Sequence, residues 1–403
     1  MKILFIRSLN PFYETGASAN RFVGLLKGLL EKNVQVTMVV TGGYNNPQEY
    51  KLGGKVKQYP NLEVHYTTTL FNYNVWLRRI NKFVLNRFIK IINTSRLKSF
   101  FKGEFDYVWL TKDEDILFAF KQYANLIKGK TLIELNEFND VHRGQGTTGN
   151  KLQMQRAIAS EKIFNQSVGE IDCFAVMTKT LIAHYSKMAK NDAKFLHLPM
   201  TVETERFKNI SNTIQYKKPY VAFTGTFNNA KDGVDVLIKA FAKVVNKYPD
   251  LNLYLAGFYH YDVDIQKKLI ADYGLNDRIT YLGILDKEQI PAFVCNATVL
   301  VLSRPDSHQA QGGFPTKLGE YLATGNPVCV TKVGEIPNYL EDGVSAFMAI
   351  PGNVDSFADA MDRALSNPEE AKKVGANGKK VAETNFSTDV QTKRLVEFLK
   401  ANK

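Results

Sequence analysis

The feature that most constrains the fold is an alternation of short apolar strands and amphipathic helices, which runs through the chain twice. The first series opens with an apolar strand at Ile3–Arg7 and a helix from about Ala17 to Lys32 that is apolar on one face. A largely β-branched run at Val34–Val40 follows, as is typical of a strand buried in a parallel sheet. Repeated βα units of this kind predict an α/β fold with a doubly wound parallel sheet.

The alternation restarts after residues 200–218, a polar stretch interpreted as a linker. A strand at Tyr220–Thr224, a helix at Val234–Lys247 and a strand at Asn252–Ala256 open the second series. A chain of 403 residues also exceeds what one hydrophobic core usually fills. We therefore predict two Rossmann-like doubly wound domains, over residues 1–200 and 201–385.

The chain carries few signals for export or for a membrane span. No run of about 18 apolar residues occurs, and the apolar start is short and interrupted by Arg7, so neither a transmembrane helix nor a signal peptide is predicted. Cys173, Cys295 and Cys329 have the spacing of neither a disulfide framework nor a zinc site. These features favour a cytoplasmic location.

The segment Ser303–Thr331 has the features of an anion site. A glycine pair at 312–313 lets a ligand approach the backbone, and Pro315 suits the first position of a helix. The unpaired amides and the positive dipole end of that helix would attract a pyrophosphate. Glu320 lies four residues after Thr316, on the same helix face, and its carboxylate can accept hydrogen bonds from both hydroxyls of a ribose. The alternative is an ordinary helix with a surface glutamate.

A second candidate segment spans Tyr220–Phe241. A strand runs into Gly225 and Thr226, a short polar loop holds Lys231, and an amphipathic helix follows. A lysine at the mouth of such a loop can neutralise a diphosphate as a point charge. The alternative is a solvated loop lysine.

Over roughly 220–350 the sequence resembles the family-4 glycosyltransferases, whose GT-B architecture has two facing Rossmann-like domains. Lys231 matches the lysine of the family's Arg–Lys pair, while Thr226 stands where the arginine is usual. Glu320 matches the second glutamate of the family's Glu-x7-Glu motif, and Gly312 occupies the place of the first. The missing glutamate contacts the sugar ring in the family, so the departure concerns the identity and orientation of the sugar.

The resemblance implies which residues bind a nucleotide-sugar donor. Lys231 would stabilise the departing diphosphate and so take part in catalysis. The implied donor-binding residues are Gly225, Thr226, Lys231, Gly283, Gly313, Phe314, Pro315, Thr316, Lys317 and Glu320. No separate cofactor is expected, and no metal, because a lysine and helix amides would do a cation's work.

The resemblance places the acceptor on the first domain. Gly16, Ala17 and Ser18 begin the first helix, where the family has a glycine-rich acceptor loop. They form no dinucleotide fingerprint, since G-x-G-x-x-G is absent, and an NAD enzyme is therefore not predicted. The family's catalytic-face residue follows the fifth strand. Here that position falls at Asn136, Glu137 or Asp140, where Glu137 is the candidate catalytic carboxylate and a loop acid without such a role is the alternative.

Residues 71–102 are basic and aromatic. They hold eight Lys and Arg residues and no Asp or Glu, a local charge of +8. Over about 76–92 a helical wheel separates apolar residues such as Trp76 and Phe88 from basic ones such as Arg78 and Lys82. Interfacial membrane helices have this build, and we predict that it binds an anionic membrane surface. The alternatives are a helix packed on the sheet with a solvated basic face and, less favoured, a nucleic-acid site.

Together these features predict a retaining glycosyltransferase that moves a sugar from a nucleotide diphosphate sugar to an acceptor hydroxyl. The acceptor would be a glycan or a lipid-linked sugar of cell-surface polysaccharide or glycolipid assembly, at the inner face of the membrane. Two alternatives stay open: a sugar-nucleotide 2-epimerase of the same architecture, and a non-catalytic nucleotide-binding adaptor. The resemblance, with the apolar spacing of Val390, Leu395 and Leu399, also predicts that residues 386–403 form a helix packed on the first domain.

Overall fold

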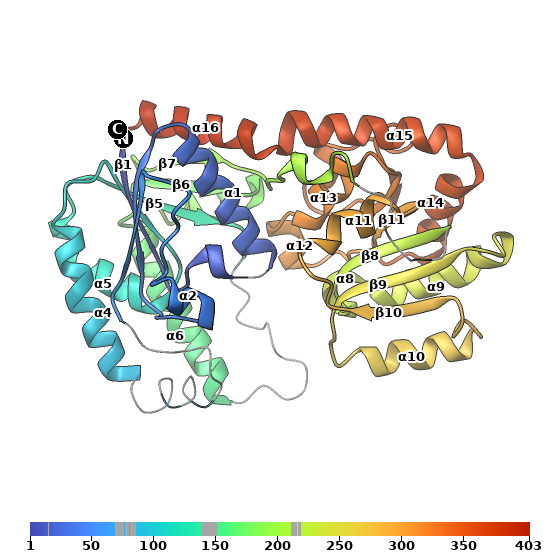
Figure 1. Cartoon of the computed structure of the whole chain (residues 1–403), viewed down its shortest axis with the longest axis horizontal. Coiled ribbons are helices and arrows are strands. Elements are labelled where there is room, and N and C mark those ends of the chain that lie inside the picture. The colour runs from blue at the N-terminus through green and yellow to red at the C-terminus, as the bar shows by residue number, and fades with distance from the viewer. Residues whose placement is uncertain are drawn as a thin grey trace. The chain divides into compact units, whose positions relative to one another are not determined.

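A computed structural model describes residues 1–14, 16–68, 76, 80, 86–138, 151–210, 216 and 219–403. These residues form two compact units, each with a sheet of its own (Figure 1). The first unit comprises Met1–Pro199 and Gln391–Lys403, and the second comprises Met200–Val390.

The first unit contains a seven-stranded parallel sheet with the order β3-β2-β1-β4-β5-β6-β7. Its strands are β1 (Lys2–Arg7), β2 (Gln35–Val40), β3 (Leu62–Tyr66), β4 (Tyr107–Leu110), β5 (Lys130–Leu135), β6 (Cys173–Val176) and β7 (Lys194–His197). In the interior strand β1, Ile3 through Ile6 are buried, so both faces of the sheet are covered.

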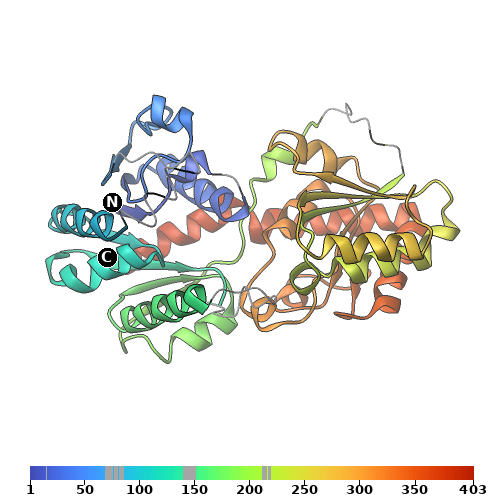
Figure 2. The same cartoon turned by 90° about the horizontal axis from the view of Figure 1, so that it is seen from below.

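Helices cover the two faces of this sheet. Ile3 and Phe5 pack with α1 (Ala17–Glu31) and with the C-terminal part of α16 (Thr388–Ala401). Leu4 and Ile6 point the other way, into a core with α4, α5, α6 and α7. These four helices span Asn86–Phe101, Glu114–Tyr123, Lys151–Val168 and Lys179–Tyr185, and the short elements are η1 (Pro11–Tyr13), α2 (Pro47–Lys51) and η3 (Ala124–Leu126). Helices α4, α5 and α6, coloured cyan to green in Figures 1 and 2, lie side by side.

The second unit contains a six-stranded parallel sheet with the order β10-β9-β8-β11-β12-β13. Its strands are β8 (Tyr220–Thr226), β9 (Asn252–Phe258), β10 (Ile279–Gly283), β11 (Val299–Leu302), β12 (Val328–Thr331) and β13 (Phe347–Ala349). Strand β8 pairs with β9 on one side and with β11 on the other.

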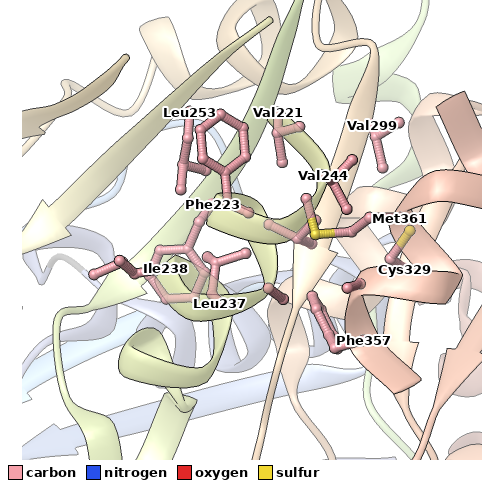
Figure 3. Packing of buried hydrophobic residues seen from close by; sticks show 14 of the residues in the cluster. Val221, Phe223, Leu237, Ile238, Val244, Leu253, Val299, Cys329, Phe357 and Met361 are labelled. Carbon is pink, nitrogen blue, oxygen red and sulfur yellow. The ribbon is translucent and has the colours of Figure 1, made fainter. Parts of the chain in front are cut away.

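Alternate residues of β8 face opposite layers of helices. Val221 and Phe223 pack against α9 (Val234–Val244) and α14 (Val354–Ser366), as Figure 3 shows for Leu237 and Phe357. On the other face, the Thr224 amide donates to the Tyr321 hydroxyl at 2.6 Å, which joins β8 to α13 (Thr316–Thr324). The remaining helices are η4 (Thr204–Phe207), α8 (Asn229–Asp232), η5 (Val245–Lys247), α10 (Val263–Asp272), α11 (Gln289–Cys295), α12 (His308–Gly312), η6 (Ile336–Asn338), α15 (Pro368–Val381) and η7 (Ala382–Phe386).

The prediction of two doubly wound parallel-sheet domains is confirmed. The interpretation of 200–218 as a linker is wrong for its first part, because Phe207 of η4 is buried and the Val202 amide donates to the Phe386 carbonyl at 2.8 Å within the second unit. The C-terminal segment rejoins the first unit at Gln391 rather than at 386, and its Leu395 and Leu399 lie in that unit's core.

The C-terminal helix is also tied to the first sheet by a buried hydrogen bond. The Tyr107 hydroxyl donates to the Leu399 carbonyl at 2.8 Å. We expect Tyr107→Phe to destabilise the first unit by about 1 kcal/mol, the usual net value of such a bond. Both tryptophans, Trp76 and Trp109, belong to this unit, so tryptophan fluorescence during urea unfolding reports on it. A midpoint equal to that of the wild type would contradict the expectation, and Tyr273→Phe, at an exposed position, is the control.

Candidate functional site

The carboxyl end of the second sheet is the place where this fold can bind a ligand. Strands β9 and β11 flank β8: the chain runs outward from β8 through β9 to β10, and then crosses back to continue at β11 on the other side of β8. Ligands of open parallel sheets bind at such a switch point, beyond the carboxyl ends of the strands. The predicted donor residues of β8, α8 and α13 belong to elements that start or end at this edge.

Two glycines bring the ends of β8 and β9 together. Gly225 and Gly257 lie opposite each other in the parallel register, with φ of 151° and 143°. A Cβ added at Gly257 would lie 1.7 Å from the Gly225 carbonyl oxygen, so only glycine fits there. The backbones of β8 and β9 therefore come close together at Gly225 and Thr226, and the chain then continues into the turn of α8 (Asn229–Asp232), which contains Lys231.

Lys231 lies on the short helix α8, at an exposed position. The Asn228 side chain caps this helix by accepting the Lys231 amide hydrogen at 2.8 Å, and Asp262 Oδ2 accepts the Asn229 amide hydrogen at 2.7 Å. Gly233 ends the turn in a left-handed conformation, with φ of 66°. The backbone of the turn is thus fixed from both sides, while the Lys231 side chain faces solvent.

A second lysine reaches the end of β8 from α13. Lys317 Nζ lies 2.8 Å from Asp232 Oδ1 and 4.7 Å from the centroid of the Phe223 ring. The same ammonium is 2.2 Å from the position of a Cβ added at Gly225, so the glycine leaves the space that it occupies. Asp232 is buried, and this ion pair fixes the α8 turn to the first turn of α13.

The N-terminus of α13 has no side-chain cap. Pro315 is the N-cap residue, not the first helical residue as predicted, and a proline side chain cannot accept a hydrogen bond. The first turn contains no acidic residue. Gly313 and Phe314 are buried beneath it, and the Phe314 ring lies 5.6 Å from that of Tyr339. The amides of Thr316 and Lys317 thus begin a helix whose positive end suits an anion.

Glu320 lies one turn further along α13. Its Oε1 is 3.3 Å from Arg206 Nη1 of η4, and about a quarter of the side chain is exposed. Burial raises the pKa of the Glu320 carboxyl, and the positive charges of Arg206, Lys287 and Lys317 oppose that rise. The protein environment therefore disfavours the charge of this carboxylate, and the three cations offset part of that effect.

Gly283 ends β10, on the far side of β9 from β8, with φ of 71°. Beside it, the rings of Tyr259 and Tyr281 stack with centroids 6.2 Å apart, and Phe227 packs edge-on against both. Tyr259 is 59% exposed, which leaves a flat aromatic surface at this end of the sheet. Such a surface is suited to a planar ring.

The predicted acceptor-side residues belong to the first unit. Gly16 is the N-cap of α1, with φ of 119°, and Ala17 and Ser18 are the first residues of that helix. Asn136 and Glu137 follow β5. The Asn136 Oδ1 atom is buried and has no hydrogen-bond partner among the described residues. Asp140 lies outside the described residues.

The predicted membrane segment is described in part. Helix α4 begins at Asn86, and in it Phe88, Ile91 and Ile92 are exposed, as is Trp76 before it. Lys90 forms an ion pair with Glu114 of α5. The basic residues Arg78, Arg79 and Lys82 lie outside the described residues.

Within the described ranges, no group of three or more His, Cys, Asp or Glu residues could hold a metal ion. In the same part of the chain, no helix has the length and apolar character needed to cross a membrane.

Sequence reasoning missed two residues of this region. The sequence patterns indicate no role for Asp232, and Arg206 falls in the stretch interpreted as a linker. Each is paired with a residue far along the chain, Lys317 and Glu320 respectively. Of the two, only Asp232 could have been suspected from the sequence, because it directly follows Lys231.

The sequence was compared with known families and curated proteins. Residues 204–381 match the family model described as Glycosyl transferases group 1. The chain is 26% identical over 170 residues to the alpha-D-kanosaminyltransferase of Streptomyces kanamyceticus, covering 42% of each protein. It is 30% identical over 122 residues to the MMP alpha-(1→4)-mannosyltransferase of Mycolicibacterium hassiacum, covering 30% of this chain and 28% of that protein. The matched region thus spans less than half the length of either relative.

The fold was compared with solved structures. HepE of Anabaena, solved in complex with UDP-glucose, superposes with a TM-score of 0.70 and covers 100% of both chains at 14% identity. At that identity the similarity establishes the fold. Residues 204–381 of this chain are thus similar to the group 1 glycosyltransferases, and the chain as a whole has the two-domain GT-B fold.

Proposed function

We propose that this protein is a retaining glycosyltransferase that moves a sugar from a nucleotide diphosphate sugar to an acceptor hydroxyl. The observation that carries the proposal is the cluster at the carboxyl end of the second sheet. There the uncapped N-terminus of α13 lies beside Lys317, which is held by Asp232, and Glu320 follows one turn later. The structure of HepE with UDP-glucose supports a nucleotide sugar as the ligand class.

Each part of the cluster suits one part of such a donor. The first amides of α13, with Lys231 and Lys317, would bind the diphosphate, and Glu320 would accept hydrogen bonds from the ribose. The Lys317 ammonium lies against Gly225. The next residue, Thr226, stands where the family-4 glycosyltransferases usually have an arginine. We propose that Lys317 supplies positive charge at that end of β8.

The proposed reaction needs no nucleophile from the protein. The bond from the sugar's anomeric carbon to the diphosphate oxygen breaks, while the acceptor oxygen bonds to the same carbon on the same face. The acceptor proton passes to the departing phosphate oxygen. Lys231 and the helix amides stabilise the negative charge that grows on the leaving group. The lysine charge and the helix amides take the place of a metal ion, so we expect turnover to persist in EDTA.

The acceptor would bind to the first unit. Asn136 and Glu137 follow β5 at the carboxyl end of that sheet, where the buried Asn136 Oδ1 atom can accept a hydrogen bond from a hydroxyl. We propose that Glu137 orients the acceptor hydroxyl. The acceptor class is a glycan or a lipid-linked sugar of cell-surface polysaccharide or glycolipid assembly.

A nucleotide-release assay tests the function. Purified protein is incubated with UDP-glucose, GDP-mannose or another nucleotide sugar, with and without alkyl glycosides or lipid extract as acceptor. A glycosyltransferase releases the nucleoside diphosphate faster with acceptor and forms a glycosylated product. A 2-epimerase would convert the donor with no acceptor present, and a binding protein would bind the nucleotide without turnover, so either result would overturn the proposal.

We further propose that the protein is cytoplasmic and attaches to the inner face of the membrane through residues 71–102. Exposed Phe88, Ile91 and Ile92 of α4 support this, as does exposed Phe118 on the neighbouring helix α5. Apolar side chains of this kind insert at the boundary between headgroups and acyl chains, and the basic residues of the segment would contact anionic lipid.

We expect the variant with Arg78, Arg79, Lys82 and Lys90 all changed to Gln to lose most of its binding to anionic vesicles. Four basic residues near a membrane contribute about 1 kcal/mol each. Co-sedimentation with phosphatidylserine-containing vesicles measures the effect, which added salt should imitate in the wild type. A control with Lys239, Lys243, Lys247 and Lys373 of the second unit changed to Gln matches the charge lost. Equal binding of the wild type to neutral and anionic vesicles would contradict the proposal.

A further inference from the structure

The segment that opens the second unit is held directly against α13. Gly319 precedes Glu320, and a Cβ added there would lie 3.1 Å from Met200 Sδ and 3.3 Å from Val202 Cβ. The absence of a side chain at this position lets residues 200–202 pack closely on the helix. Phe207, the last residue of η4, is buried and anchors the same segment. This packing places Arg206 opposite Glu320.

Arg206 joins three elements of the unit. Its Nη1 lies 3.3 Å from Glu320 Oε1, and its Nη2 donates to the Lys287 carbonyl at 3.4 Å. About a fifth of the Arg206 side chain and a quarter of the Glu320 side chain are exposed. The guanidinium is therefore fixed by a second contact, and it takes up one of the two carboxylate oxygens.

We propose that Arg206 is a positioning residue for the donor, which orients the Glu320 carboxylate toward the vicinal hydroxyls of the nucleotide ribose. Arg206 occupies one side of the carboxylate and limits its rotation, so the remaining acceptor positions point away from η4. The inference rests on the proposed function, because it requires that Glu320 binds ribose. Arg206 would thus favour ribonucleotides over nucleotides that lack the ribose hydroxyls, and it would make no contact with the diphosphate.

Arg206 also acts on the charge of Glu320. Burial raises the pKa of this carboxyl, and Arg206 is the leading cause that lowers it. Without Arg206 the carboxyl would take up a proton at a higher pH. A protonated carboxyl has lost its negative charge and part of its acceptor capacity, so ribose binding would weaken as the pH falls through that pKa.

The test compares ribonucleoside diphosphates with their 2′,3′-dideoxy analogues. Binding of UDP, GDP and ADP, and of each dideoxy analogue, is measured by isothermal titration calorimetry. The wild type should prefer the ribonucleotide, and Glu320→Gln should abolish the preference. Arg206→Gln should reduce the preference about fivefold, the upper range for a partly exposed ion pair. Arg206→Lys should retain much of the preference for the ribonucleotide, since lysine keeps the positive charge.

The control is Arg363→Gln, which removes another arginine–carboxylate pair of the same unit, Arg363 with Asp342 at 3.0 Å. It should leave the preference unchanged. Repeating the titrations from pH 8 downwards should show the preference lost at a higher pH in Arg206→Gln than in the wild type. A purely structural role would change the melting temperature and leave this pH dependence where it is.

The possible failures are distinguishable. If Glu320→Gln abolishes the ribose preference and Arg206→Gln leaves it intact, the positioning role is wrong and the donor site stands. If Arg206→Gln weakens ribo- and dideoxy-nucleotides equally, the role is also wrong. If Glu320→Gln leaves the preference unchanged, or the wild type binds none of the nucleotides, the proposed donor site itself is overturned.

Discussion

Lys231→Ala is expected to lower kcat for sugar transfer by roughly a hundredfold. The negative charge on the departing diphosphate grows as the glycosidic bond breaks, so a cation beside it stabilises the transition state more than the bound donor. Losing such a stabiliser typically costs ~3 kcal/mol of activation free energy. The Lys231 side chain is exposed, the Asn228 side chain accepts the Lys231 amide hydrogen, and Asp262 accepts that of Asn229 in the same turn, so folding should be unaffected.

The measurement is steady-state kinetics with saturating donor, beside circular dichroism and thermal unfolding. Lys373→Ala, at an exposed position on α15, is the matched control and should keep the wild-type rate. Lys231→Arg keeps the charge in a different shape and should retain part of the rate. A Lys231→Ala enzyme that folds normally and turns over like wild type would show that Lys231 does not stabilise the leaving group.

Glu320→Gln is expected to raise the KM for the donor, with a smaller effect on kcat. The ribose is far from the bond that breaks, so its contacts with Glu320 are equal before and during the reaction. A hydrogen bond to a charged group contributes on the order of 1.5–3 kcal/mol, which corresponds to roughly ten- to more than a hundredfold in affinity. Initial rates over a range of donor concentrations separate the two parameters.

Glu370→Gln, in the first turn of α15, serves as the control, since its carboxylate is exposed and lies on another helix. If both Lys231→Ala and Glu320→Gln were merely less stable, with unchanged kinetics per folded molecule, the two residues would be structural. A fall in kcat at unchanged KM in Glu320→Gln would contradict the assignment of Glu320 to the ribose.

Most of the fold was predictable, because parallel strands buried on both faces carry their own signal. Strand β1 is apolar from Ile3 through Ile6, and β8 shows the same pattern before Gly225. Element η4 was not predictable, since its sequence is polar apart from Phe207, and a single buried residue gives no periodicity. Helix α15 likewise has a weak sequence signal, because its apolar face contains small residues such as Ala371 and Gly375.

The candidate site was predictable where local chemistry determines it. The glycine pair and Pro315 indicate the start of α13, and the register from there to Glu320 follows from helix geometry. Sequence could not give the pairing of Asp232 with Lys317 or of Arg206 with Glu320, because the partners are 85 and 114 residues apart. Such contacts depend on which strands and helices become neighbours, and local patterns do not contain that information.

The central claim is that a nucleotide diphosphate sugar binds where β8, α8 and α13 meet. Calorimetric titration of the folded protein with nucleoside diphosphates and their sugars tests it most directly, comparing the wild type with the double variant Lys231→Ala/Glu320→Gln. We predict one donor bound per wild-type chain, and binding reduced beyond detection in the double variant, whose melting temperature and circular dichroism stay the same. Equal affinity of the two proteins for the same nucleotide would contradict the account.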